Sequence, residues 1–145
     1  MPIIRNIWKD VPTPLELHED DRGAITDIFY KEEVNHVNSI ISKKGALRGD
    51  HFHKKTTQHM LMVSGSMEYW YKHVDSKEPA ICIIVKKDDI VTSPPFEIHA
   101  LKMLEDGTEF ITFSSGLRGG ADYEADTFRI EPSLIPGRTK PQAHF

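Results

Sequence analysis

The sequence is poor in cysteine, has no long apolar run and has no excess of positive charge. Cys82 is the only cysteine among 145 residues, so the chain forms no internal disulfide, which is typical of a reducing compartment. No apolar run approaches the roughly 20 residues of a membrane-spanning helix, and the net charge of −4 argues against a general nucleic-acid binder. The first residues, Met1 to Asn6, lack the basic start and long apolar stretch of a signal peptide. We therefore expect a cytoplasmic protein that binds neither membranes nor nucleic acids.

The sequence also lacks any convincing amphipathic helix. Short strand-like runs alternate with turn signals such as Lys44-Gly45, Ser64-Gly65 and Ser93-Pro94-Pro95. Strands without βαβ alternation predict an all-β protein, a closed barrel or a sandwich. We expect one domain over residues 1–145, with an N-terminal arm over about 1–19 and a C-terminal tail over about 132–145. The expected strands are 24–30, 34–42, 47–54, 57–64, 66–73, 80–87, 98–104 and 109–115, with a weaker one at 127–131.

Two of the expected strands are apolar on both faces. Residues 80–85 read Ala-Ile-Cys-Ile-Ile-Val, and residues 59–63 read His-Met-Leu-Met-Val. A small barrel fills its inside with side chains, but an apolar outer face needs cover as well. A second subunit is the simplest cover, so we predict a homodimer. Within the first run, we expect Cys82 to be a small buried hydrophobic residue and not a nucleophile.

Histidines are concentrated in one short predicted hairpin. His51 and His53 are separated by one residue, so on a strand their side chains point to the same face. On the returning strand Gln58 and His59 are neighbours, and only one of them can face inward. His99 lies about forty residues further on and is another candidate for the same site.

Two kinds of chemistry fit such a cluster. Histidine has an ordinary pKa near 6.5, which suits proton transfer near neutral pH. Alternatively, His51, His53 and His99 with the oxygen of Gln58 match the ligands of a divalent metal such as zinc, nickel, iron or manganese. Polar side chains that merely line the wall of a barrel are disfavoured, because buried polarity of this amount is costly to keep without a use.

The spacing of these residues resembles the first sequence motif of the cupins. It reads Gly45, five residues, His51-x-His53, four residues, Gln58, six residues and Gly65, with glutamine where cupins usually carry glutamate. The stretch from Pro94 to His99 is similar to the second cupin motif, although Phe96 and Met103 replace the usual glycine and asparagine. The resemblance implies a cupin-type double-stranded β-helix, or jelly roll, with the histidines at the mouth of the barrel.

A narrower resemblance covers most of residues 20–126. The string 45–52, Gly-Ala-Leu-Arg-Gly-Asp-His-Phe, is similar to a motif of the dTDP-4-dehydrorhamnose 3,5-epimerases. Together with His53-Lys54 it also resembles a motif of the dTDP-4-keto-6-deoxyhexose 3,4-ketoisomerases. The Asp21-Arg22-Gly23 opening resembles both families, and Asp122-Tyr123 resembles the ketoisomerases.

This resemblance implies an isomerase or epimerase that removes a proton next to the ketone of a nucleotide-linked 4-keto sugar, in polysaccharide or glycan biosynthesis. The substrate is then the nucleotide sugar, and no cofactor is required, although the site is also compatible with a divalent metal. By resemblance His51 and His53 are catalytic, as base and second proton carrier. The expected substrate-binding residues are Arg48, Gln58, Lys54 and Tyr71.

Arg48 requires a local irregularity to take part. It is three residues from His51, so on a regular strand the two side chains face opposite ways. Gly49 permits a bulge that turns Arg48 to the same face. We therefore predict a bulge at Gly49.

One departure from both sugar families keeps the function open. They place a tyrosine in the pocket as a proton donor, whereas this sequence has Asn-Ser-Ile-Ile at 38–41 in the corresponding region. Tyr69 and Tyr71 are candidates to replace it. Two alternatives remain at this point: a metal-dependent cupin enzyme such as a dioxygenase, and a non-catalytic sugar-binding cupin.

Overall fold

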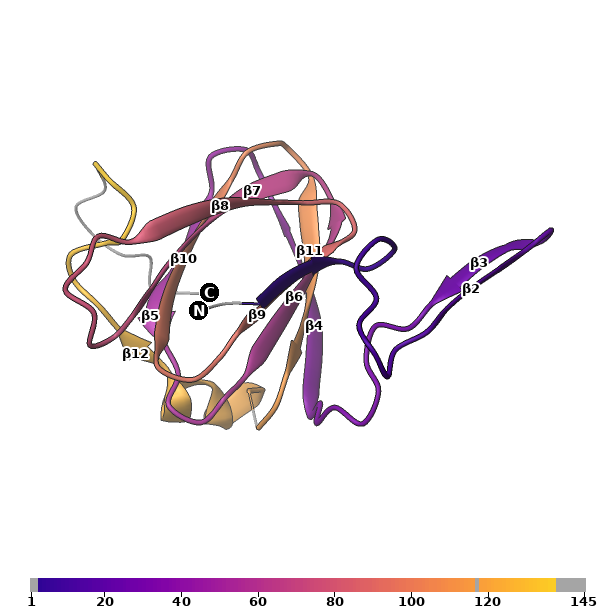
Figure 1. Ribbon diagram of the computed structural model, residues 1–145. Helices are drawn as coiled ribbons and strands as arrows, with labels where there is room; N and C mark the ends of the chain where they lie inside the picture. Colours follow the sequence, from indigo (N-terminus) through magenta and orange to yellow (C-terminus); the bar gives the residue numbers. More distant parts are fainter. Residues whose placement is uncertain (1–2, 117, 138–145) are drawn as a thin grey trace.

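The computed structural model describes residues 3–116 and 118–137. Two five-stranded antiparallel sheets face each other and enclose one interior (Figure 1). Apart from β7 and β8, neighbouring strands within these two sheets are not consecutive in the sequence, which is the arrangement of a jelly roll and confirms the predicted all-β fold. The first sheet runs in the order β1 (Ile3–Asn6), β9 (Asp89–Ser93), β6 (Gln58–Ser64), β11 (Thr108–Ser114) and β4 (His36–Ser42). The second runs in the order β12 (Phe128–Arg129), β5 (Leu47–Phe52), β10 (Glu97–Met103), β7 (Ser66–His73) and β8 (Ile81–Lys86).

Most predicted strands agree with the observed ones to within two residues at each end. The strand predicted at 24–30 is shorter, because β3 (Gly23–Thr26) ends where the chain leaves a hairpin with β2 (Leu17–Asp20). β1, β2 and β9 were not predicted, since β9 has only five residues between two turn signals and β1 lies in the segment expected to be an arm. The 3-10 helix η1 (Gly120–Asp126) was missed as well, because it buries no residue and so carries no apolar pattern.

The interior changes character along the strands. At one end of the strands it holds a tightly packed apolar core, whose fully buried members include Met62, Met67, Met103, Leu101 and Phe110. Toward the other end, successive inward-facing positions become polar, as in Met62, Met60 and Gln58 along β6. The same change occurs in β10, from Met103 through Leu101 to His99, and in β11, from Phe110 through Thr112 to Ser114.

The outer face of the first sheet is covered by the chain itself. Leu61 and Ile90 on that face pack against Ile7, and Ile28 and Phe29 complete the cluster. Leu61 on the outer face of β6 therefore has cover within one chain, whereas Val63 on the same face is 36% exposed. The homodimer stays a prediction.

The outer face of β8 is bare in the described chain. Cys82 is exposed and Ile84 is 53% exposed, because β8 is the edge strand of its sheet and no described segment packs over it. The prediction that Cys82 is buried is therefore wrong for the chain by itself. Apolar periodicity alone did not distinguish an edge strand from a central one.

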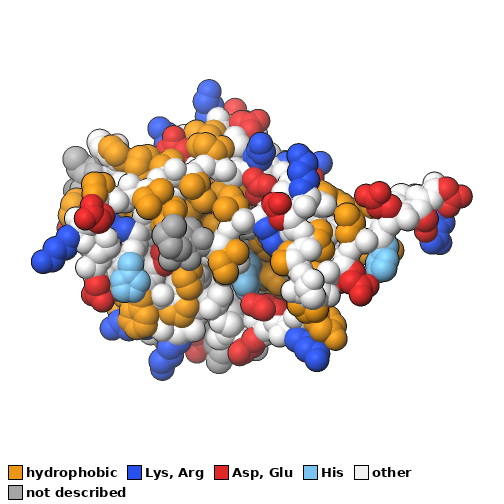
Figure 2. All heavy atoms as spheres, in the orientation of Figure 1, with side chains coloured by type: hydrophobic (Ala, Val, Ile, Leu, Met, Phe, Trp, Pro, Cys, Tyr) orange, Lys and Arg blue, Asp and Glu red, His pale blue; other side chains and the backbone are white. Residues whose placement is uncertain are grey.

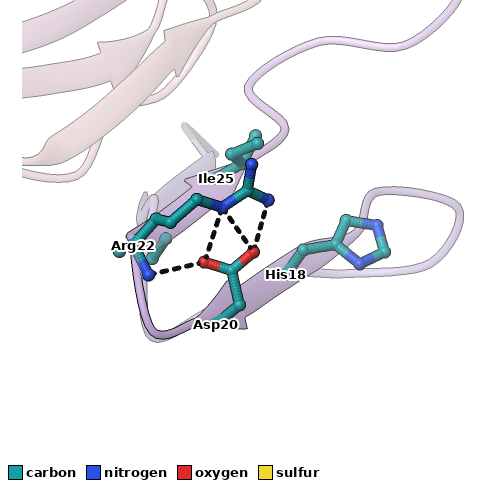
Figure 3. Close-up of a pocket in the computed structure, with 6 residues that line it drawn as sticks. His18, Asp20, Arg22 and Ile25 are labelled. Carbon is teal, nitrogen blue, oxygen red and sulfur yellow. Dashed lines mark hydrogen bonds and ion pairs between the residues drawn. The ribbon is translucent and has the colours of Figure 1, made fainter.

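The hairpin of β2 and β3 projects from the body of the molecule (Figure 1). All its residues except Thr26 are exposed, and its surface is strongly charged (Figure 2). At its tip Arg22 folds back onto Asp20, with 2.6 Å between Nη2 and Oδ2, beside a shallow hollow that also involves His18 and Ile25 (Figure 3). Both charges of this pair are exposed, so the hollow carries no buried polar group.

Parts of both predicted end segments are held in place. β1, within the expected N-terminal arm, pairs with β9 in the first sheet. Near the other end, the Ser133 hydroxyl and the Leu134 amide donate hydrogen bonds to the buried carboxylate of Asp50, at 2.7 and 2.9 Å. The rest of the expected C-terminal tail, from residue 138 onward, lies outside the described residues.

Candidate functional site

Three histidines meet at the polar end of the interior. His51 on β5 lies directly opposite His99 on β10, and His53 follows just after the end of β5. Their ring centroids are 4.8 to 5.6 Å apart, and the three side chains are buried. We call His51, His53 and His99 the histidine cluster. The predicted chelating arrangement of His51 and His53 is thus present, with His99 as its third member.

A bulge in β5 shapes this part of the sheet. The pairing of β5 with β10 shifts register between His99 and Ala100, where Gly49 and Asp50 both have positive φ, of 86° and 60°. A Cβ at position 49 would lie 2.7 Å from the carbonyl oxygen of His99, so glycine is required there for the strands to approach. The predicted bulge at Gly49 is therefore confirmed.

The bulge does not bring Arg48 to the histidines. Arg48 pairs with Leu101 and so shares the inward face, as the prediction required. However, its Nε donates to Ser42 Oγ at 2.9 Å, and Ser42 pairs with Thr108 beyond the apolar core. The guanidinium of Arg48 is thus directed toward the opposite end of the interior.

Hydrogen bonds fix how two of the imidazoles are presented. His53 donates from Nδ1 to the Asp126 carbonyl oxygen at 2.7 Å, so its Nε2 carries the lone pair. The Nδ1 of His99 lies 3.1 Å from Ser93 Oγ. One potential ligand atom from each histidine of the cluster lies within 4.8 Å of the others. Anchored Nδ1 atoms with converging partner nitrogens are the arrangement found in metal-binding histidines.

Burial keeps the cluster neutral at pH 7. Desolvation is the main cause that lowers the pKa of His53 to about 4 and that of His99 to about 3. The pKa of His51 is also well below 6.5, because of burial first and then the charges of His99 and His53. Neutral imidazoles can accept a proton or bind a metal, so the residues present fit either chemistry.

Gln58 faces the interior, and His59 faces outward. Gln58 pairs with Ser93 and Ser114, whereas His59 contacts Thr92 and Glu32 on the outer face. Within the described part of the chain, Gln58 Oε1 has no hydrogen-bond partner of ordinary geometry, although Gln58 is close enough to His53 to raise the pKa of that imidazole. A buried amide oxygen of this kind is available to a bound metal or guest.

The other predicted binding residues divide into one near the cluster and one away from it. Tyr71 on β7 lies directly opposite His99 and shares its inward face. The Nζ of Lys54 instead lies 4.3 Å from the centre of the Phe128 ring, outside the interior. The other candidate tyrosine, Tyr69, is fully buried and donates to Glu97 Oε1 at 2.9 Å. Burial raises the pKa of Glu97 to about 7.

The mouth of the barrel is closed by the segment that contains η1. Asp126, its last residue, accepts hydrogen bonds on its carboxylate from the backbone amides of Lys54, Lys55 and Thr56, at 2.8 to 3.0 Å. Burial opposes ionisation of Asp126, but these hydrogen bonds outweigh it and lower its pKa. The cavity beside Gln58 is only about 20 Å³, enough for about one water molecule.

Arg118 is a residue of the site that sequence analysis missed. It lines the same small cavity as Gln58, is 4% exposed, and its charge lowers the pKa of all three histidines. It lies between glycines in an irregular segment, where no periodicity predicts the direction of a side chain. The nearby Asp122-Tyr123 motif was the only signal in the sequence for this region.

Residues 18–115 match the model of a protein family described as the polysaccharide biosynthesis C-terminal domain. The chain belongs to this family. The matched residues include the whole of the histidine cluster and Gln58, and they end just before Arg118. No curated protein matches the chain.

Solved structures confirm the cupin fold. The capsular polysaccharide assembling protein CapF from Staphylococcus aureus is 28% identical, with a TM-score of 0.60 over 83% of this chain and 33% of CapF. The chain thus spans about a third of the length of CapF. QdtA, a sugar 3,4-ketoisomerase from Thermoanaerobacterium thermosaccharolyticum in complex with TDP, is 18% identical, with a TM-score of 0.67 over 90% of this chain and 88% of QdtA.

A sugar epimerase has the same fold. ChmJ, a 3'-monoepimerase from Streptomyces bikiniensis in complex with dTDP-quinovose, is 20% identical, with a TM-score of 0.66 over 88% of this chain and 75% of ChmJ. Within the described residues of our chain, no helix is long and apolar enough to cross a membrane.

Proposed function

We propose that the chain is an isomerase or epimerase of a nucleotide-linked 4-keto sugar in polysaccharide biosynthesis. The observation that carries this proposal is the buried, neutral histidine cluster with Gln58 beside it, in a member of a polysaccharide biosynthesis family. The similarity in fold to a ketoisomerase with TDP and to an epimerase with a dTDP-sugar supports the substrate class.

The chemistry begins with removal of a proton from the carbon next to the ketone. The C–H electron pair moves into the ring and the ketone becomes an enolate, while the proton passes to His51 or His53. Return of a proton to the opposite face of the same carbon inverts that carbon. Alternatively, the proton is delivered to the former ketone carbon while the hydroxyl on the deprotonated carbon gives its proton to the enolate oxygen, and the ketone moves by one carbon. Because burial lowers the pKa of the histidines, the accepting imidazoles are unprotonated at pH 7.

We propose that the η1 segment moves to admit the sugar. The cavity of about 20 Å³ beside Gln58 does not admit a sugar while Asp126 holds η1 against residues 54–56. We therefore include opening of this segment in the proposal. Closing segments of this kind exclude water from many active sites.

A metal-dependent reaction is the second candidate. It is favoured by the ligand atoms that converge within 4.8 Å and by the anchored Nδ1 of His53. His51, His53 and His99 would hold a divalent ion with Gln58 as an oxygen ligand, and the ion would act as a Lewis acid on the ketone oxygen. In this version the histidines are ligands and do not accept the proton.

The decisive experiment is exchange of solvent deuterium into nucleotide-linked 4-keto sugars. We expect exchange next to the ketone with wild-type protein and a loss of at least about 100-fold in His51→Ala. His59→Ala is the matched control, because His59 faces outward and its loss leaves the cluster intact. Tight binding without exchange would instead identify a sugar-binding protein without catalytic activity.

Metal analysis separates the two versions. If the reaction needs metal, purified protein contains about one equivalent and chelator abolishes exchange. Full exchange in metal-free protein eliminates the metal-dependent version and leaves proton transfer by histidine.

We also propose that the protein works as a homodimer in which the projecting hairpin packs against a second copy. A two-stranded hairpin with all but one residue exposed is only marginally stable alone. Ile25 on this hairpin is 68% exposed, which is costly without cover. We expect Ile25→Asp to convert a dimer into a monomer in light scattering, and Ile84→Asp on β8 to leave the dimer intact. The reverse result would place the interface on β8.

A further inference from the structure

We propose that Arg118 is the cation that stabilises the enolate oxygen formed in the histidine cluster. This inference rests on the proposed function and assigns to it a catalytic residue. It follows from the position of a buried guanidinium whose charge no described carboxylate pairs with.

Arg118 lies at the inner side of the closing segment. Its side chain is 4% exposed and lines the cavity shared with Gln58, Ser114 and Tyr123. Nη1 donates to the Tyr123 carbonyl oxygen at 3.1 Å and to Thr127 Oγ1 at 2.9 Å, and the guanidinium lies 4.9 Å from the centre of the Tyr123 ring. Among residues 3–116 and 118–137, these hydrogen bonds use only Nη1, so the other guanidinium nitrogens are available to a guest in the cavity.

No carboxylate of the described residues forms a direct ion pair with Arg118, although the charges of Asp126 and Glu124 lie near enough to raise its pKa against the larger effect of burial. Among residues 3–116 and 118–137, no carboxylate lies within ion-pair distance of its guanidinium. The nearby Glu124 is paired with Arg129 instead, at 2.7 Å. A buried cation without a directly bonded counter-ion is costly, and an anion that arises next to it lowers that cost.

The proposed reaction creates such an anion at the right moment. When the C–H bond next to the ketone breaks, its electron pair forms a C=C bond and the carbonyl electrons move onto oxygen. That oxygen is neutral in the substrate and negative in the enolate, so a fixed cation beside it favours the transition state over the ground state. The substrate's diphosphate is charged throughout and would be bound before and after the step.

The test compares Arg118→Met and Arg118→Lys with wild type in solvent deuterium exchange. We expect Arg118→Met to lower kcat by about 100- to 1000-fold with KM changed less than about 5-fold. Arg118→Lys keeps the charge but not the planar fork, and we expect it to recover part of kcat. Calorimetric titration with TDP should show similar affinity in all three proteins if Arg118 acts on the enolate oxygen and does not bind the nucleotide; a loss of TDP affinity in Arg118→Met that matches its loss of kcat would overturn the inference.

Two control variants separate catalysis from structure. Thr127→Val removes an acceptor of Arg118 without removing charge, and Arg129→Met removes a cation that is already paired with Glu124. We expect less than about 5-fold change in kcat for each. An equal loss in Thr127→Val and Arg118→Met would show that Arg118 only fixes the segment.

The outcomes distinguish this inference from the proposed function. If wild type exchanges deuterium and Arg118→Met keeps full kcat, the role of Arg118 is wrong and the function stands. If the wild-type protein introduces deuterium into none of the nucleotide-linked 4-keto sugars, the proposed function is wrong, and so is the role of Arg118. If Arg118→Met does not fold, Arg118→Thr replaces it as the uncharged variant. When Arg118→Lys and Arg118→Thr both fold, equal kcat values for the two would overturn the inference.

Discussion

The two ends of the barrel interior are built from the same strands but from different side chains. At one end Met62, Met67 and Met103 pack with Leu101 and Phe110, with no more than 1% exposure each. At the other end β5, β6 and β10, with the residue just after β5, present the histidine cluster and Gln58, each no more than 3% exposed. The apolar end needs no explanation beyond the hydrophobic effect. The polar end gains little from burial, so its composition points to a bound guest.

This contrast separates residues kept for stability from residues kept for activity. In many proteins the two roles overlap, because a binding site shares its walls with the core. Here a short step along β10, from Leu101 to His99, passes from one role to the other. Substitutions at the apolar end should therefore lower stability, and substitutions at the polar end should lower activity with little effect on stability.

The largest expected difference is in stability. Met103→Ala should lower the free energy of unfolding by about 3 kcal/mol, because it leaves a cavity in a packed core. His99→Leu should change it by less than about 1 kcal/mol in metal-free protein, because a buried polar group is replaced by an apolar one of similar size. Urea unfolding at pH 7 measures both. A loss of 3 kcal/mol in His99→Leu would show that the cluster also supports the fold.

Acid should destabilise the polar end and not the apolar end. The pKa of His53 is about 4 in the folded state and near 6.5 when unfolded, so the unfolded chain binds more protons between these values. Stability from this group is present above pH 6.5 and is lost as pH falls toward 4. Between pH 7 and pH 5 we expect a loss of about 2 kcal/mol from His53 alone. Urea unfolding of His53→Gln should show that much less pH dependence, and an unchanged dependence would contradict the buried, neutral state.

The smallest expected effect concerns the closing segment. Asp126→Asn keeps one side-chain oxygen but removes the charge that accepts three backbone amides, so the segment should open more readily. We expect a loss of about 1 kcal/mol in overall stability, together with faster hydrogen exchange at Lys55 and Thr56. Asp122→Asn, in the same helix, is the control. Equal exchange rates in both variants would show that Asp126 does not hold the segment closed.

Sequence patterns predicted the site well where it lies on regular strands. The single residue between His51 and His53 placed both on one face, and motif spacing chose Gln58 over His59 as the inward residue. The bulge at Gly49 also followed from the sequence, because only a change of register lets Arg48 share a face with His51. Where the guanidinium of Arg48 then goes depends on Ser42, which is distant in the fold from the histidines.

The remaining parts depend on contacts that no local pattern encodes. The position of Arg118 depends on an irregular segment that Asp126 holds against the barrel, so its approach to the histidine cluster is determined by tertiary contacts. Likewise, the exposure of Cys82 follows from the place of β8 at the edge of a sheet, which strand order decides and periodicity does not.

The carboxylate of Asp50 links a segment outside the barrel to the histidine cluster inside it. Asp50 anchors Ser133 and Leu134 on one side of the sheet, and the next residue, His51, belongs to the cluster on the other. A displacement of Ser133 and Leu134 therefore reaches the histidine cluster through Asp50 and the peptide bond that joins it to His51. A truncation that removes Ser133 and all following residues should therefore loosen the geometry of the histidine cluster, although it removes no residue of that cluster.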